Sequence, residues 1–326
     1  MTFTGRGLYA ASSKEPRGRS SGWLLIGAAL ALAVLVGGAL LSFGSVELGG
    51  DTRSDDFSGV EKVEVRTGSG GDVTVHGTED DEVTVERSLR GTPFADPRER
   101  LEADGGTVKA EATCGGGAWF LGDCAVDYTI SVPEGTAVSV DSASGDVELD
   151  EVVGTVDVSA GSGSIRGEDL TGDIRAATTT GEIDLGDVEG DVEMESNTGS
   201  ISAEGSGGTV TAETTTGEVD LEEFAAESFD VETTTGSVNL EAGFAKARVE
   251  TTTGSVGIEA LKPFDSLEVD TTTGSVEVDV PEGSYRVTGD STTGERDVDV
   301  DTSAAGGAPR IAVSTTTGSF NIEAED

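Results

Sequence analysis

The sequence predicts an all-β protein: a single-stranded parallel β-helix, or β-solenoid, that follows one N-terminal transmembrane helix. Two observations predict the solenoid, a glycine-anchored repeat of about 18–20 residues and the alternation of apolar and polar residues inside each repeat. A third, an uncharged run of 21 residues near the N-terminus, predicts the membrane span. Because parallel crossovers strongly prefer one hand, we expect a right-handed solenoid.

The uncharged run extends from Trp23 to Phe43, enough for a helix to span about 30 Å of hydrocarbon. Four basic residues and one acidic residue precede it, whereas acidic residues follow it. The positive-inside rule then predicts a single-pass protein of the cell membrane, with residues 1–22 cytoplasmic, the helix at 23–43, a linker at 44–59 and the remainder outside. The alternative is a cleaved signal peptide, but its apolar region would be unusually long and no A-x-A-like site follows it.

A recurring glycine, most often in the phrase TTTG, divides residues 134–326 into solenoid repeats. The first five of these glycines are 18 residues apart and the later steps are 19, 18, 20, 20 and 24 residues, at Gly145, Gly163, Gly181, Gly199, Gly217, Gly236, Gly254, Gly274, Gly294 and Gly318. A period near 20 is typical of solenoids, in which each unit buries its apolar face against its neighbours. The alternative, a left-handed hexapeptide helix, needs an aliphatic residue at every sixth position, which this spacing does not provide.

Apolar residues alternate with polar ones on both sides of the repeat glycine, which indicates strands rather than helices. Ile183 and Leu185 lie two and four positions after one glycine, and Val192 and Met194 lie seven and five positions before the next. In the early coils a second glycine marks a bend midway, so a coil reads strand, bend, strand, turn. Apolar residues at the bend can form a short third side: Val153, Leu170, Val188, Phe224, Phe244 and Phe264.

We interpret the phrase TTTG as a corner of the coil. By alternation its first threonine points inward and its middle threonine outward, while the glycine accepts the positive φ that a tight turn needs. Threonine hydroxyls on successive coils then form ladders, in which they bond to one another and to the turn backbone.

Residues 60–133 are also strand-like but lack a clean period, and we expect an irregular β region that caps the N-terminal end of the solenoid. Within it, RGTPFADPRERLEADGG at residues 90–106 is expected to form a short helix or a loop. The two cysteines of the chain, Cys114 and Cys124, lie in this region. Outside the cytoplasm such a pair favours a disulfide over a zinc site, since no second pair and no histidine lie near it.

The chain has 63 acidic and 20 basic residues, a formal charge of −43 at pH 7. Such a field excludes nucleic acid and anionic lipid headgroups as partners and leaves cations or basic surfaces. In the repeat register, carboxylates fall on two outer lines, four positions before the glycine (Glu195, Glu213, Glu232, Glu250, Asp270, Asp290) and five after it (Glu204, Glu222, Glu241, Glu259, Asp279, Asp299). We interpret both lines as solvated charge that keeps the rod soluble. The alternative is weak calcium sites between coils, because calcium prefers oxygen ligands. The candidate calcium ligands are the ten residues of these lines other than Asp279 and Asp299.

The sequence lacks the residue clusters that are typical of enzymes. The single histidine, His76, has no serine or cysteine context that would suggest a catalytic base. The phrase TTTGS lacks the lysine and the following helix of a phosphate-binding loop. We therefore expect no catalysis and, apart from the calcium alternative, no cofactor.

The units SGDVEL and TTGSV, the stretch CAVDYTISVPEGTAVSVDSASGDVEL and the preceding membrane span resemble the putative-adhesin domain family of bacterial and archaeal envelope proteins. The resemblance covers about Val60 to the C-terminus and implies a β-helix at the cell envelope, but it carries over no functional residue. Arg296, in place of an inward aliphatic residue, and a six-residue excess around SAAGGAP depart from the pattern.

The function that these observations predict is non-enzymatic adhesion, envelope binding or structural support by a membrane-anchored solenoid. The alternative is a sensing or regulatory ectodomain in an envelope-stress pathway. That alternative requires a membrane partner, because the predicted cytoplasmic segment is too short and featureless to signal alone.

Overall fold

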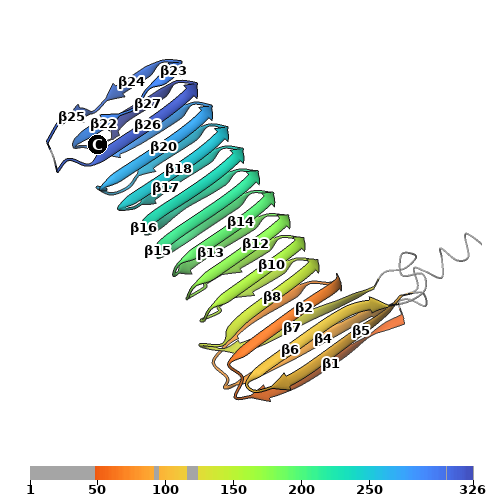
Figure 1. Ribbon diagram of the computed structural model, residues 1–326. Coiled ribbons are helices and arrows are strands. Elements are labelled where there is room, and N and C mark those ends of the chain that lie inside the picture. The colour runs from red at the N-terminus through yellow and green to blue at the C-terminus, as the bar shows by residue number, and fades with distance from the viewer. Residues whose placement is uncertain (1–47, 92–94, 116–123, 306, 326) are drawn as a thin grey trace, which may run out of the picture.

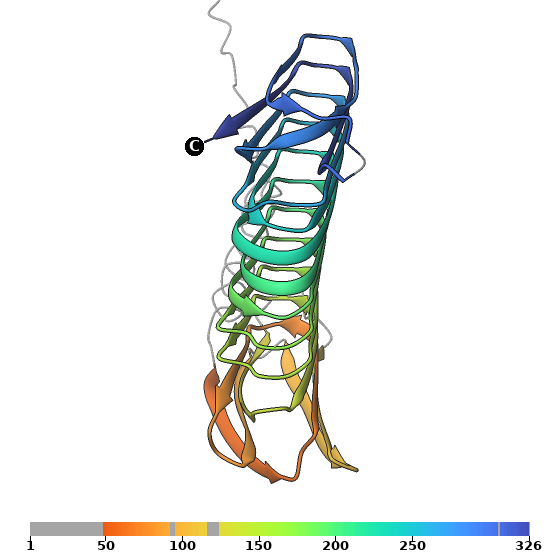
Figure 2. The ribbon, with the colours of Figure 1, turned by 90° about the vertical axis from the view of Figure 1, so that its left-hand side faces the viewer.

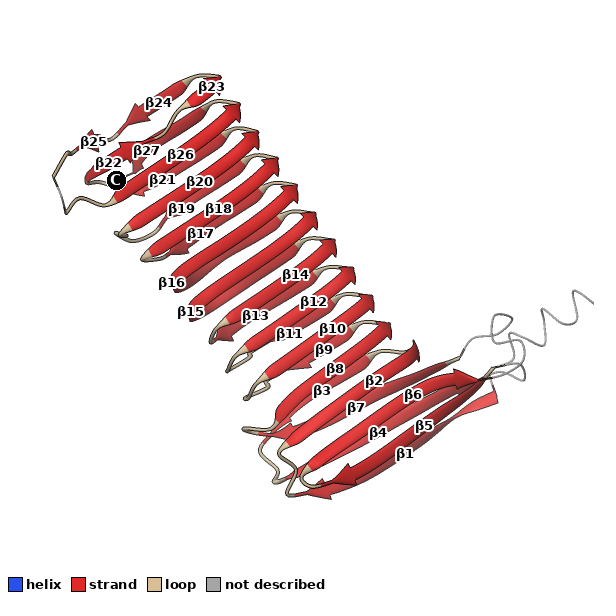
Figure 3. Cartoon of the chain, in the orientation of Figure 1, coloured by secondary structure: helices blue, strands red, loops and turns tan. Residues whose placement is uncertain are grey.

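The structure is a computed structural model that describes residues 48–91, 95–115, 124–305 and 307–325. The regular elements in these residues are β-strands, which wind into a long rod (Figure 3). The predicted cytoplasmic segment 1–22 and transmembrane helix 23–43 lie outside the described residues. Within the described residues no helix has the length and apolarity needed to cross a membrane. The all-β solenoid predicted from the repeat is confirmed by its parallel strand pairing.

Seven strands form the N-terminal part: β1 (Leu48–Ser58), β2 (Lys62–Gly70), β3 (Val73–Thr78), β4 (Glu82–Gly91), β5 (Asp96–Asp104), β6 (Thr107–Gly115) and β7 (Ala125–Pro133). The early coils contain β8 (Ala137–Ser144), β9 (Val147–Asp150), β10 (Val156–Ser162), β11 (Ile165–Glu168), β12 (Ile174–Thr180), β13 (Ile183–Glu189), β14 (Val192–Thr198), β15 (Ile201–Thr216) and β16 (Val219–Thr235). The later coils contain β17 (Val238–Gly243), β18 (Lys246–Thr253), β19 (Val256–Ala260), β20 (Ser266–Thr273), β21 (Val276–Pro281), β22 (Ser284–Thr288), β23 (Ser291–Thr293), β24 (Arg296–Asp299), β25 (Asp301–Thr302), β26 (Arg310–Thr317) and β27 (Phe320–Glu325).

Each regular coil contributes to two faces of the rod. The threonine face consists of β8, β10, β12, β14, the second halves of β15 and β16, β18, β20 and β26, which pair in parallel. The opposite face consists of β9, β11, β13, the first halves of β15 and β16, β17, β19, β21 and β27. Equivalent residues stack from coil to coil, as in Val156, Ile174 and Val192. Figure 2 shows the stacked coils from a second side.

The core consists of the alternating apolar residues that the sequence predicts. Ile183, Leu185, Val192 and Met194 are each 3% exposed or less, and their equivalents in the other regular coils are buried in the same way. Because parallel strands stack each inward side chain on its counterpart, the apolar interior is continuous along the rod.

The third side forms as expected except in its first member. Leu170, Val188, Phe224, Phe244 and Phe264 are buried, but Val153 is 36% exposed and its neighbour Val152 points inward. The backbone gives the reason. Glu151 has a positive φ of 55°, and so do its counterparts Asp169 (53°), Asp187 (49°) and Glu223 (51°). In each of these coils the residue directly after this position is buried.

The N-terminal cap corrects two predictions. Residues 48–58, inside the predicted linker, form β1, which pairs antiparallel with β4 and covers its free edge. The stretch 90–106, expected to be a helix or a loop, contains β5, which pairs antiparallel with β6. A hairpin forms there because Gly105 and Gly106, with φ 58° and 81°, supply the tight turn.

The last coils are stacked out of chain order. β26 pairs with β20 on one side and with β22 and β23 on the other. β27 likewise lies between β21 and β24. Residues 284–302 therefore form the outermost coil, although they precede β26 in the chain (Figure 1). The departure at Arg296 follows from this position, because no further coil of the described residues stacks on it. Its guanidinium lies 5.7 Å from the ring centroid of Phe320.

Candidate ligand-binding groove

The corner of the coil has the geometry predicted for the phrase TTTG. Its first threonine is buried, as at Thr178 and Thr214, whereas the middle and last threonines are exposed. At Thr178 and Thr214 the buried hydroxyl donates a hydrogen bond to the corner glycine of the preceding coil, with Thr178 Oγ1 3.3 Å from the Gly163 carbonyl oxygen. Within the described residues, the equivalent hydroxyls of Thr233, Thr251 and Thr271 are buried without a partner. Because these three hydroxyls are unpartnered, the predicted ladder of hydroxyls bonded to one another does not run along the TTTG corners of the described chain. A hydroxyl–hydroxyl bond does occur nearer the cap, where Thr67 donates to Ser142 at 3.1 Å.

Corner glycines stack on one another along the rod. A Cβ atom on Gly181 would lie 1.9 Å from the carbonyl oxygen of Gly163, and the same contact recurs at Gly199 over Gly181. Gly181 also has φ 154°, a conformation that L side chains rarely adopt. The corner therefore needs glycine for two reasons, its backbone conformation and the lack of room for a side chain.

A groove of about 1030 Å³ runs along the threonine face. Its lining repeats from coil to coil and combines one outward residue with the first and middle residues of the TTTG phrase. In the middle of the groove this outward residue is a carboxylate. At the end formed by the N-terminal coils it is a small residue, Ser159 or Ala177. The groove thus offers repeated carboxylates beside repeated hydroxyls.

Five of the six carboxylates predicted for the first line form an unbroken ladder along this groove. Glu195, Glu213, Glu232, Glu250 and Asp270 occupy successive parallel strands in register. The sixth, Asp290, does not follow Asp270, which corrects the prediction. Ser314 of β26 pairs with Asp270 instead, and Asp290 lies beyond it, because β26 is inserted between the two coils.

The second predicted line lies on the opposite face. Glu222, Glu241, Glu259 and Asp279 stack in register, and Glu204 lies at a register shift before them. The same insertion places Glu323 between Asp279 and Asp299. Sequence reasoning missed Glu323, although its position five residues after Gly318 is the signal that defines the line. A smaller groove of about 430 Å³ follows the early part of this face and includes Glu204 and Glu222 in its lining.

Crowding of like charges raises the pKa of several ladder carboxyls. Burial, Glu232 and Glu195 raise the pKa of Glu213, and the neighbouring charge of Asp220 raises that of Glu222. Two arginines offset the repulsion on the threonine face. Arg175 pairs with Glu193 and Glu195, and Arg248 pairs with Glu250.

The geometry bears on the calcium alternative. Each ladder supplies one carboxylate per strand, and in the part of the chain that the structure describes no three carboxylate, histidine or cysteine side chains converge to hold a metal. This arrangement suits solvated charge. Calcium binding between coils stays a prediction. It concerns Glu195, Glu213, Glu232, Glu250, Asp270 and Asp290 on the first line and Glu204, Glu222, Glu241 and Glu259 on the second.

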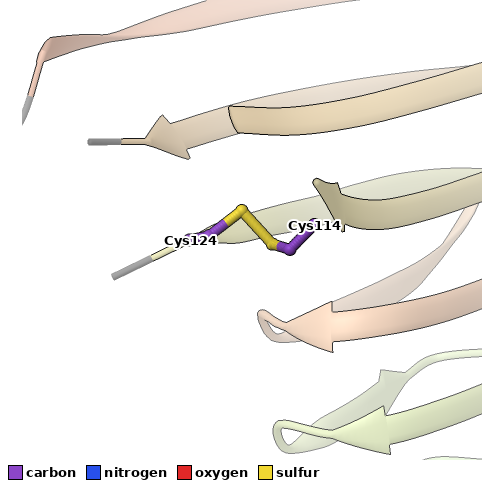
Figure 4. Close-up of a disulfide and its surroundings, with 2 residues drawn as sticks. All are labelled: Cys114 and Cys124. Carbon is purple, nitrogen blue, oxygen red and sulfur yellow. A yellow bond between two sulfur atoms is a disulfide. The ribbon is translucent and has the colours of Figure 1, made fainter. Parts of the chain in front are cut away.

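Cys114 and Cys124 form a disulfide (Figure 4). It joins the end of β6 to the residue before β7, in the cap and away from the groove. His76 lies half-exposed on β3, with its Nδ1 3.4 Å from an Asp150 carboxylate oxygen. Neither feature lines the two grooves described above.

These features define an acidic β-solenoid with threonine and glycine corners. The chain belongs to the Toastrack DUF4097 family, which matches residues 60–323. This match confirms the family resemblance predicted from about Val60 to the C-terminus.

One similar structure is a putative adhesin from Parabacteroides merdae, with 12% identity and a TM-score of 0.49, covering 86% of this chain and 98% of that one. Another is a putative adhesin from Bacteroides fragilis, with 11% identity and a TM-score of 0.42, covering 86% and 99%. A third is a putative lipid binding protein from Parabacteroides distasonis, with 13% identity and a TM-score of 0.39, covering 85% and 98%. No curated protein matches the chain in sequence.

Proposed function

We propose that this protein is a non-enzymatic adhesion module of the cell envelope, anchored by residues 23–43 and displaying its solenoid outside the membrane. The groove on the threonine face is the observation that carries this proposal. It is long, open and repetitive, whereas sites for small substrates are concave and mostly apolar. A repeated surface of this kind suits an extended partner.

The charge of the groove indicates the chemistry of that partner. Five successive carboxylates, from Glu195 to Asp270, line it together with exposed threonines. A line of one sign of charge attracts the opposite sign over a long range. The partner surface is therefore basic, and adhesion weakens as salt screens the attraction.

Cells that express the full chain provide the test, with adhesion measured as cell aggregation and display measured by labelling intact cells. Replacing Glu213, Glu232 and Glu250 with Gln should abolish adhesion at unchanged display. The matched control replaces Glu222, Glu241 and Glu259 on the opposite face, which alters the net charge equally and should leave adhesion intact.

Equal loss in both triple variants would mean that overall charge, and not the groove, causes adhesion. A variant that lacks residues 1–21 but keeps the membrane span distinguishes adhesion from the alternative function, sensing. Adhesion that survives this deletion supports the present proposal, whereas a regulatory response that is lost with display intact supports sensing.

A further inference from the structure

Strands β26 and β27 fill a slot between two parts of the chain that precede them. One wall of the slot is formed by β20 and β21, and the other by β22, β23 and β24. The inward residues Ile311, Val313, Phe320 and Ile322 are each 1% exposed or less. The inserted segment 310–325 is thus as deeply buried as a coil in the middle of the rod.

The inserted segment also carries the complete corner of a regular coil. Gly318 stacks on Gly274, and Gly294 of the outermost coil stacks on Gly318 in turn. Thr315 Oγ1 lies 3.5 Å from the carbonyl oxygen of Gly274, the bond that Thr178 and Thr214 make in their own corners. The slot therefore recognises the TTTG repeat itself, through contacts that any identical segment would reproduce.

The outermost coil depends on the inserted segment. Its ladder hydrogen bonds to the rod run through β26 and β27. Its direct contacts to earlier coils include Tyr285, whose ring stacks on Phe264 at 5.6 Å and whose hydroxyl donates to the Pro281 carbonyl at 2.6 Å. Withdrawing segment 310–325 would leave two strand edges that face each other with unpaired backbone groups, which template strand pairing.

We propose that the partner which fills this slot is a second copy of the chain, and that two copies exchange segments 310–325 reciprocally. Each segment finds in the other copy the same hydrogen bonds, buried side chains and stacked glycines that it has in its own. Reciprocal exchange is therefore isologous and closes as a dimer. Because the contacts are the same within one copy and between two, the fraction of exchanged chains depends on protein concentration and rises with it.

The exchanging end lies at the opposite end of the rod from β1 (Figure 1). If the membrane anchor precedes β1, the slot lies far from the membrane, where rods from two surfaces meet. This adhesive consequence rests on the proposed function, whereas the exchange between two copies does not.

Cysteine pairs on separate chains test the exchange. Asp270 and Ser314 are neighbours in register across the slot. Full-length chains with Asp270→Cys are coexpressed with full-length chains of a different tag with Ser314→Cys, and the native disulfide is kept. We expect a disulfide-linked heterodimer. The control coexpresses Glu250→Cys with Asp270→Cys, neighbours in register on coils that do not exchange, and should give none.

The proposal is overturned if no heterodimer forms while the double variant Asp270→Cys/Ser314→Cys closes within one chain. It is equally overturned if the control pair links to the same extent, because collisions would then explain both. Failure here is distinguishable from failure of the proposed function. A second double variant, Glu268→Cys/Ala312→Cys, closes the same slot between neighbours in register that do not line the groove. If cells that display this variant in its closed form still aggregate, the adhesive function holds but has another partner. Aggregation that returns only on reduction supports exchange.

Discussion

Gly254 lies directly over Gly236 in the stack of corner glycines. A Cβ atom on Gly254 would come within 1.7 Å of the carbonyl oxygen of Gly236, and Gly254 has φ 155°. The spacing of parallel strands brings the corners this close, so the stack itself excludes any side chain. The repeat glycine is thus a packing requirement of the solenoid as well as a turn residue.

Gly254→Ala should therefore destabilise the rod by about 3 kcal/mol or more, since backbone strain and the steric overlap add. The measurement is the free energy of unfolding in urea. Gly257→Ala is the matched control, because the nearest atom to its added Cβ is the Asn239 side-chain oxygen at 3.4 Å. Similar losses in the two variants would contradict the role of the stack.

The buried threonines divide into two groups that should respond oppositely to valine. Within the described part of the chain, the Thr251 hydroxyl is buried without a hydrogen-bond partner, whereas Thr214 Oγ1 lies 3.3 Å from the Gly199 carbonyl oxygen. Thr251→Val should stabilise the protein by about 1 kcal/mol, because a methyl replaces an unsatisfied hydroxyl. Thr214→Val should cost up to about 1 kcal/mol. Thermal melts of the two variants check the opposite signs, and a loss at Thr251 as large as that at Thr214 would refute the distinction.

Stability should pass through a maximum in mildly acidic solution. Burial raises the pKa of Glu213, Glu259 and Asp279, and neighbouring carboxylates raise it further. Their ionised forms thus cost stability at neutral pH, and the cost disappears as pH falls through the raised pKa values toward the ordinary Glu value of 4.5.

Glu64 acts in the opposite sense. Hydrogen bonds from Lys62 and Lys109 lower its pKa to about 2, so its stabilisation is present above 4.5 and is lost as pH falls from there toward 2. The melting temperature should rise as pH falls from 7 toward the ordinary Glu value of 4.5, and decline as pH falls further toward 2. Sodium chloride should reduce the rise, since salt screens the repulsion, and Glu64→Gln should reduce the decline. A melting temperature that falls steadily from pH 7 would contradict this account.

The repeat predicts the local structure of each coil well, that is, its corner and its buried residues. The glycine and the alternation of apolar residues identify the corner and the inward residues, because each coil obeys the same local constraints on φ and burial. Val153 shows the limit of alternation alone: the left-handed conformation of Glu151 shifts the register by one residue. The acidic residue that also precedes Leu170 and Val188 is the sequence signal for this shift.

The repeat predicts less well which coils are neighbours. Register defines the position of Asp270 within its coil, but it cannot tell whether the next coil along the rod is also the next along the chain. In the cap, β1 and β5 carry charged residues with little apolar periodicity, so their pairing depends on edges that other strands leave open. Both shortcomings concern contacts between segments, which a local pattern does not encode.

One measurement tests the central claim, the stacking order of the last coils, most directly. The double variants Asp270→Cys/Ser314→Cys and Asp270→Cys/Asp290→Cys are oxidised under the same conditions, and internal disulfides are measured by mass spectrometry. Neighbouring parallel strands lie about 4.8 Å apart, within reach of a disulfide, whereas two strand spacings exceed the ~7 Å limit between Cα atoms. We expect an internal disulfide in the Asp270→Cys/Ser314→Cys variant and none in the Asp270→Cys/Asp290→Cys variant. A link between 270 and 290 would show that the coils follow chain order, which would contradict both the inserted strands and the exchange built on them.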